Sequence, residues 1–453
     1  MAKDFTKGSP AKVIFSFAMP MLIGNVFQQL YSTVDSIIVG NFVGKNALAA
    51  ISGSTSVQFL IIAVAFGFTA GMSVVLSQVY GARDYDKLKR TFSTGLIFVF
   101  FMSIVLAVFG YFVSEPILRA LGTPPEILPD SVTYLRVMFV GLPAMFLYNM
   151  YAAVLRAVGD SKTPLYFLII ASIINIVLDY SFVVFFSWGV MGVALATMIA
   201  QIISGILCFF YINKNVEIFH LRKDEYIFDK EIIGAIVKYG LPAAVQQSIM
   251  SISFLAVQKF VNYFGGDMMA AFGVANRIEG FVTMPMMNMA MALSMFAGQN
   301  IGAGEEKRAK DGVKSTMLMQ IAFCAVMVVL LPIAAKPLID LFGLAEDPRV
   351  VELGVMAIDF CAKFYVVFAL FQTLNQFHRG AGDTQFSMVA SLCMVFVRIP
   401  MTYLMVYVWN VGEISIWAGM IIGWGTALII NTIRFLSGGW KGKAYVQKRI
   451  TED

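Results

Sequence analysis

Two acidic residues lie inside long apolar stretches of the sequence, where an ionised side chain is unfavourable. Asp35 lies in the first such stretch and Asp179 in the fifth, and no Lys or Arg is close to either in sequence. A charge inside a membrane costs roughly 3 kcal/mol or more unless it is paired or hydrated, so such residues are functional candidates by default. On a helix, Asn175 would lie one turn before Asp179 on the same face, and Thr197 lies on the next apolar stretch.

Together these side chains could bind a small cation. A rise of about 1.5 Å per residue puts Asp35 roughly 7 Å below the outer surface, and Asp179 and Thr197 roughly 10 to 14 Å below it. Carboxylate, amide and hydroxyl oxygens are hard donors of the kind that small cations accept, and two close carboxylates in low dielectric can share a proton. We therefore predict a Na⁺ or H⁺ site at Asp35, Asn175, Asp179 and Thr197. The alternative is architectural, with Asp35 capping a frayed helix end and Asp179 bonding a neighbouring backbone group.

The composition of the chain indicates which elements hold these residues. Of its 453 residues 59% are apolar and only 13% are charged, and its mean hydropathy is +0.77, outside the range of soluble domains. Apolar runs of about 18 residues or more recur along the chain, each long enough to cross the membrane as a helix. We predict an all-α integral membrane protein with twelve transmembrane helices, at residues 13–39, 46–79, 91–113, 131–154, 164–186, 189–213, 231–264, 268–297, 312–333, 350–378, 384–409 and 414–436.

The distribution of basic residues tests the number of spans, because short cytoplasmic loops accumulate Lys and Arg. With twelve spans and a cytoplasmic N-terminus, the outer side holds only Lys45, Arg119, Lys336 and Arg349. The cytoplasmic segments then hold most of the others, including Lys3, Lys7, Lys12, Arg83, Lys87, Lys89, Arg90, Lys223, Lys307, Arg308, Lys310, Lys448 and Arg449. We expect a multi-pass protein of the cell membrane with both termini in the cytoplasm. The net charge of +5 is then explained by the basic cytoplasmic loops that orient the protein in the membrane, and it gives no reason to expect a nucleic acid partner.

An internal repeat relates the two halves of the chain. Shifted by 221 to 223 residues, the sequence aligns Pro20 with Pro242, and the segment from Arg156 to Asp160 with the segment from Arg379 to Asp383. Because each half contains an even number of spans, the two repeats should be parallel in the membrane.

The repeat predicts the domain organisation. We expect an N-lobe at 1–222 with helices 1–6 and a C-lobe at 223–453 with helices 7–12, joined by a polar linker at about 214–231. Two such bundles around a central cleft would suit transport by alternating access. A scaffold, a receptor or a channel remains the alternative of another class.

The second half shows what the acidic positions become in the other repeat. Asp35, Asp179 and Asn175 correspond there to Val257, Thr402 and Arg398. The acids are thus specific to the first half, which argues against a purely architectural role. We assign no role to Arg277, Glu279 or Arg398.

The same residues resemble the multidrug and toxic compound extrusion (MATE) family. The resemblance extends over essentially the whole chain and rests on the following features: the segment from Gln28 to Gly40 around Asp35, Pro20 fifteen residues before that Asp, the pair Asn175 and Asp179, the run from Gly192 to Thr197, and the two Arg-x-x-Gly-Asp segments.

One departure separates the chain from the NorM-like branch of that family, which has C-lobe acids on the seventh and tenth helices. Here Val257 and Gln258 stand on the seventh, and residues 368–374 contain no acid. The chain therefore looks closer to the DinF-like branch, in which coupling runs through the N-lobe. Asp359 is better explained by an i,i+4 ion pair with Lys363.

The resemblance implies an antiporter that exports organic, cationic or amphipathic compounds in exchange for inward H⁺ or Na⁺. Cation binding would alter the first helix, which can bend at Pro20 because proline lacks an N–H donor. No cofactor is expected beyond the coupling ion, and the partners would be drug-like molecules and lipid, with the protein working as a monomer.

The substrate would lie in the cleft. Amides facing lipid would be unsatisfied, so Gln28, Gln29, Gln246 and Gln247 are candidate lining residues, together with Tyr31. Met284 and Met287 belong to a Met-rich eighth helix that could adapt to flat apolar ligands, although Met is equally an ordinary packing residue.

Two other functions fit the sequence less well. A flippase for a lipid-linked precursor would need a strongly basic cavity, and basic residues within the spans are few. An enzyme would need a reacting constellation, but the sequence has only His220 and His378 as histidines and lacks HExxH, GxSxG and Walker A motifs.

Overall fold

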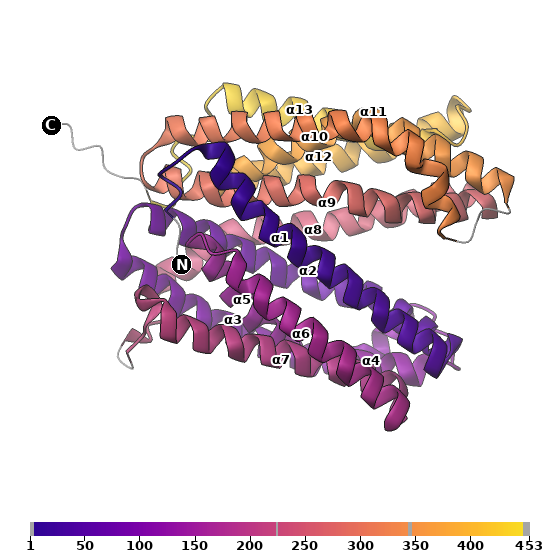
Figure 1. Cartoon of the computed structure of the whole chain (residues 1–453), viewed down its shortest axis with the longest axis horizontal. Coiled ribbons are helices and arrows are strands. Elements are labelled where there is room, and N and C mark those ends of the chain that lie inside the picture. Colours follow the sequence, from indigo (N-terminus) through magenta and orange to yellow (C-terminus); the bar gives the residue numbers. More distant parts are fainter. Residues whose placement is uncertain (1–3, 223–224, 343–346, 447–453) are drawn as a thin grey trace. The chain divides into compact units, whose positions relative to one another are not determined.

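The computed structural model describes residues 4–222, 225–342 and 347–446, and this part of the chain consists of helices joined by loops, without strands (Figure 1). Four basic residues of the orientation argument, Lys3, Lys223, Lys448 and Arg449, lie outside the described residues. The predicted all-α membrane fold is confirmed.

The helices follow the predicted spans and extend beyond several of them. In the first half they are α1 (Pro10–Ile38), α2 (Lys45–Gly81), α3 (Tyr85–Ala120), α4 (Leu128–Val140), α5 (Leu142–Ala157), α6 (Lys162–Tyr180) and α7 (Gly189–Asn215). In the second half they are α8 (Lys230–Tyr263), α9 (Gly266–Gly302), α10 (Glu306–Asp340), α11 (Pro348–Gly380), α12 (Thr384–Tyr403) and α13 (Ser415–Leu436). Single π-helical turns follow α1, α6 and α12: η1 (Val39–Val43), η2 (Ser181–Phe185) and η5 (Leu404–Val408). A short 3₁₀ turn, η3 (Glu217–Phe219), lies in the linker.

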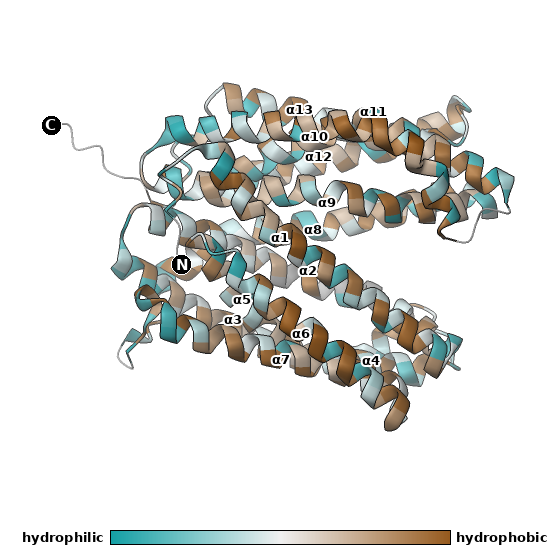
Figure 2. Cartoon of the chain, viewed as in Figure 1, coloured by the Kyte–Doolittle hydropathy of each residue, from teal (hydrophilic) through white to brown (hydrophobic). Residues whose placement is uncertain are grey.

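Among the described residues, ten helices are long and apolar enough to cross a membrane, and the pair α4 and α5 passes the same test when the two are taken together. That pair corresponds to the predicted span 131–154 and is bent by 47°. Pro143 lies in the first turn of α5 and has no N–H for the carbonyl one turn earlier, which explains the break. α2, at 37 residues, is also long enough to cross a membrane. Hydrophilic residues gather toward the helix ends and loops (Figure 2).

The chain divides into two compact units. Asp4 and Met19–Ala244 belong to the first, and Phe5–Ala18 and the described residues from 245 onward belong to the second. α1 therefore begins in the second unit and continues in the first, and α8 does the reverse. Each change of unit falls within two residues of an intrahelical proline, Pro20 or Pro242.

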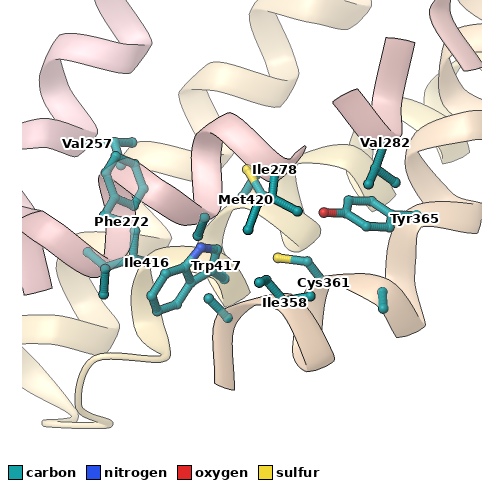
Figure 3. Close-up of a cluster of buried hydrophobic side chains, with 14 of the residues drawn as sticks. Val257, Phe272, Ile278, Val282, Ile358, Cys361, Tyr365, Ile416, Trp417 and Met420 are labelled. Atoms are coloured by element: carbon teal, nitrogen blue, oxygen red, sulfur yellow. The ribbon is translucent and has the colours of Figure 1, made fainter. Parts of the chain in front are cut away.

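Within the second unit, α9, α10 and α13 all pack against α11, and α12 packs against α13. The core includes Phe272, Ile278, Tyr365 and Trp417 (Figure 3). Gly380 at the end of α11 lies directly against the backbone of α9, where a Cβ would collide with the carbonyl of Ser294.

The repeated Arg-x-x-Gly-Asp segments have a structural explanation. Gly159 and Gly382 adopt the same left-handed conformation, with φ of 86° and 87°, which favours glycine. The acid that follows then stabilises the next element differently in each half. Asp160 accepts hydrogen bonds from the first N–H groups of α6, whereas Asp383 forms an ion pair with Arg434 at 2.8 Å.

Candidate functional site

Asp35 and Asp179 lie side by side in the first unit. Asp179 on α6 is completely buried, and Asp35 on α1 is half-buried. Their carboxyl groups are close enough to interact directly. Two ionised carboxylates have no hydrogen to share, so the contact is favourable only when a proton or another cation lies between them.

The cluster contains oxygen atoms that lack partners. Asp35 Oδ1, Asn175 Oδ1 and both carboxyl oxygens of Asp179 are buried without a hydrogen-bond partner among the described residues. Asn175 is 2% exposed, and its Nδ2 donates to Thr197 Oγ1 at 3.4 Å. The structure thus brings together all four residues of the predicted cation site. Their unpaired oxygens can accept from a hydrogen-bond donor or bind a cation.

Two tyrosines complete the surroundings of the acid pair. Tyr31 on α1 and Tyr134 on α4 lie within the electrostatic field of both carboxyl groups. In the described residues, no Lys or Arg is among the groups acting on either acid. Sequence reasoning missed Tyr134, since no spacing relates α4 to α1 or α6. It belongs to a small core with Val39 and Val193.

Both acids lie just before π-helical turns at the ends of their helices. η1 begins four residues after Asp35 and η2 begins two residues after Asp179. Such turns often occur at functional sites. Here, however, η5 occupies the equivalent position after α12 in the other repeat, where no acid is present, so the turn belongs to the architecture of the repeat.

The donor set fits an exchangeable ion. The described residues contain no group of three or more His, Cys, Asp or Glu that could hold a metal, and the cluster offers two carboxylates, an amide and a hydroxyl. Firmly held divalent ions usually take more carboxylate charge. The arrangement suits a proton or a monovalent cation that binds and leaves.

The residues expected to line a cleft differ in their environments. Gln28, Gln29 and Gln247 are exposed. Gln246 is engaged within the second unit, because its Oε1 accepts from Arg379 at 2.6 Å and its Nε2 donates to Ser391 at 2.6 Å. Its side chain therefore has partners that the sequence did not reveal.

The remaining candidates lie as follows. Met287 is 48% exposed and Met284 is half-buried, so these two side chains remain accessible. Pro20 is buried inside α1. The predicted pair of Asp359 and Lys363 is confirmed, with Nζ and Oδ2 2.7 Å apart.

The chain is similar to known proteins over nearly its whole length. The MatE family model matches residues 20–181 and again 242–404, at the interval of the internal repeat. A Bacillus subtilis protein named probable multidrug resistance protein YoeA is 31% identical over 422 residues, covering 91% of each chain. A Shewanella oneidensis FAD transporter is 26% identical over 88% of each chain. A solved outward-facing multidrug resistance MATE family transporter of the MOP superfamily matches with a TM-score of 0.90 at 23% identity, covering 96% of this chain and 98% of the other.

Proposed function

Since the chain belongs to the MatE family, whose members are transporters, we propose that it is a secondary active antiporter that exports organic compounds in exchange for inward H⁺ or Na⁺. It is a multi-pass membrane protein. The proposed substrates are cationic or amphipathic drug-like molecules, and the proposed orientation places both termini in the cytoplasm of a monomer.

The observation that carries this proposal is the acid pair with its unpaired oxygens. A cation entering from the outer side would bind Asp35 and Asp179, with Asn175 and Thr197 as further oxygen donors. Because Asp35 lies on α1, cation binding would change the position or the bend of that helix. Pro20 allows such a bend because it removes one backbone hydrogen bond from α1. The altered helix would disfavour bound drug, so that each state of the carrier holds the cation or the substrate.

Coupling through one lobe follows from the same residues. We assign it to the N-lobe, in the repeat division 1–222 and 223–453, as in the DinF-like branch. The equivalent positions Val257 and Thr402 in the other repeat carry no charge. For the substrate we retain the exposed amides Gln28, Gln29 and Gln247 as lining candidates, together with the partly buried Tyr31 and Met284 and the exposed Met287. Gln246 is a weaker candidate for substrate binding because its amide already forms hydrogen bonds with Ser391 and Arg379.

The test is drug uptake into inside-out membrane vesicles whose lumen is loaded with Na⁺ or made acidic. We expect Asp35→Asn and Asp179→Asn to abolish gradient-driven uptake while the protein still inserts in the membrane. Asp359→Asn is the matched control, because it removes an exposed, ion-paired acid at a distance in sequence from the site. It should transport normally. Uptake that persists unchanged in both site variants would remove the assignment.

A further inference from the structure

A groove on the first unit has no part in the proposed coupling. It has a volume of about 310 Å³, and its walls are apolar side chains from three consecutive helices. These are Ile104, Ala107, Val108 and Phe112 on α3, Val140 at the end of α4, and Pro143 in the first turn of α5. Most of these side chains are exposed in the protein alone, so the groove opens to the surroundings of the first unit.

The groove lies where α4 and α5 bend apart. Just before the bend, the ring of Phe139 packs against Gly110 of α3, where a Cβ would collide with it. The missing side chain lets α4 approach α3 closely at this level. The chain then bends by 47°, and Val140 and Pro143 flank the break. The space beside the bend is left unfilled by the protein.

The predicted topology puts the groove in the outer half of the hydrocarbon layer. Tyr111, which also lines it, is two residues before the outer end of the predicted span 91–113. Ile104 lies roughly 10 Å deeper, at a rise of about 1.5 Å per residue. Apolar cavities do not hold water, and a lining without contact atoms loses dispersion energy. The molecules available to fill the groove at this depth are lipid acyl chains.

Arginine side chains give the outer end of the groove a net positive charge. The Arg136 guanidinium lies over the Tyr111 ring, 5.1 Å from its centroid. Arg136 and Arg119 share the carboxylate of Glu115, with Nη2–Oε distances of 3.5 and 2.9 Å. In the described part of the chain these are the only ion pairs of the two arginines. Two positive charges therefore face one negative charge.

This charged group lies at the level of lipid headgroups. Glu115 is two residues beyond the predicted span, which corresponds to roughly 3 Å outside the hydrocarbon, and tyrosines such as Tyr111 are typical of the membrane interface. Arginine binds phosphate through paired hydrogen bonds. The side chains of Arg119, Arg136 and Glu115 are 64%, 36% and 38% exposed. Exposed ion pairs contribute little stability, so the guanidinium groups can turn from Glu115 toward a phosphate.

We propose that the groove binds one acyl chain of a phospholipid from the outer leaflet, and that Arg136 and Arg119 bind the phosphate of that lipid. Both parts of the site support this occupant, because the apolar groove lies among acyl chains and its outer end lacks one negative charge. A lipid held there fills the space beside the bend between α4 and α5. The inference adds a lipid site to the proposed export function and does not depend on it.

The experiment is native mass spectrometry of the purified full-length protein, released from detergent micelles to which a lipid has been added. The probe is dioleoyl phosphatidylglycerol. At the same lipid concentration, we expect wild-type protein to retain one more phosphatidylglycerol per chain than Ala107→Phe, which fills the groove, and one more than Arg136→Gln. Arg136→Lys retains the charge and should keep part of the difference.

Two control variants separate this site from general lipid contact. Ala325→Phe makes the same change on the exposed face of α10, and Arg349→Gln removes an outer arginine that is paired with two acids, Glu352 and Glu413. Both should retain as many phosphatidylglycerol molecules as wild type.

Two further probes separate the acyl chain from the phosphate. Dioleoylglycerol has the same chains without the phosphate, so wild type and Arg136→Gln should retain it equally. Glycerol 3-phosphate has the phosphate without the chains, and an excess of it should not release the bound lipid.

Several results would overturn the inference. Equal phosphatidylglycerol counts in wild type and Ala107→Phe, or in wild type and Arg136→Gln, would exclude the site, as would an equal loss in the two controls. Release of the lipid by glycerol 3-phosphate would mean that the arginines bind free phosphate. Protein dimers that disappear in Ala107→Phe, with no change in lipid count, would mean that a second copy of the chain occupies the groove.

Discussion

Asp179→Asn should make the protein more stable while it removes the proposed coupling. Among the described residues, the carboxyl oxygens of Asp179 are buried without hydrogen-bond partners, and so is Asp35 Oδ1. The substitution removes one negative charge from the pair and introduces an amide N–H₂ at nearly the same position. That amide can donate to Asp35 Oδ1, which accepts no hydrogen bond among the described residues.

The size of the effect follows from the unpaired atoms. A buried polar atom without a partner costs about 1 to 3 kcal/mol, and the new amide would satisfy at least one of them. We therefore expect the free energy of unfolding at neutral pH without Na⁺ to rise by about 1 to 3 kcal/mol. The same substitution would then abolish coupling and increase stability, as occurs where a functional site retains an unfavourable buried charge.

The measurement is thermal unfolding of the purified protein in detergent, in sodium-free buffer at neutral pH. Asp383→Asn is the contrasting control, because Asp383 is a buried acid with a partner, Arg434, at 2.8 Å. Its removal leaves a partly buried guanidinium unpaired, so the free energy of unfolding should fall by about 1 to 3 kcal/mol. The two Asp-to-Asn changes are thus expected to have opposite signs.

The reasoning is refuted if Asp179→Asn lowers the unfolding temperature as Asp383→Asn does. That outcome would mean that the Asp179 carboxylate is held by favourable contacts and serves the fold. Adding Na⁺ or lowering the pH extends the assay, because a ligand at 100 times its dissociation constant stabilises the folded state by about 2.7 kcal/mol. The cation that stabilises wild-type protein but not Asp179→Asn identifies the coupling ion.

Gly380→Ala forces a Cβ into the backbone of α9 and should destabilise the protein by about 1 to 3 kcal/mol. Gly273→Ala, with open space around its Cβ, should be neutral or slightly stabilising. Equal unfolding temperatures of the two variants would contradict the close approach of α11 to α9. In the linker, the Arg222 N–H and then Lys89 hold the pKa of Glu225 below its usual value of 4.5, so this contact stabilises linker docking near neutral pH and is lost as the pH falls through the lowered pKa. Amide hydrogen exchange of the linker should be faster in Glu225→Gln than in wild type at pH 7, and the difference should disappear as the pH is lowered through the pKa of the carboxyl group. A difference that is independent of pH would exclude the carboxylate as the cause.

The sequence alone was sufficient for the transmembrane spans and for the repeat. Both are local or linear properties: an apolar run must form a helix in lipid because its backbone groups have no other partner, and a duplication is visible in the order of residues. It also placed Asp35 on the first helix and Asn175 one turn before Asp179, since helical periodicity fixes which residues share a face.

The rotation of each helix about its axis was decided only by tertiary packing. Gln246 and Gln247 are adjacent in sequence, yet one is bonded to Arg379 and Ser391 while the other is exposed. Nothing in the pattern of a largely apolar helix distinguishes these neighbours, because such a helix lacks a strong polar face.

Contacts between distant helices were equally hidden from the sequence. Tyr134 lies within the electrostatic field of the acid pair, and Glu279 lies within that of Arg398, 119 positions later in the chain. The helices that carry these residues share no sequence register. In a membrane such packing is set by the fit of small residues and polar groups between helices. Hydropathy therefore determined which segments cross the bilayer, whereas the close packing of those segments decided which charges meet.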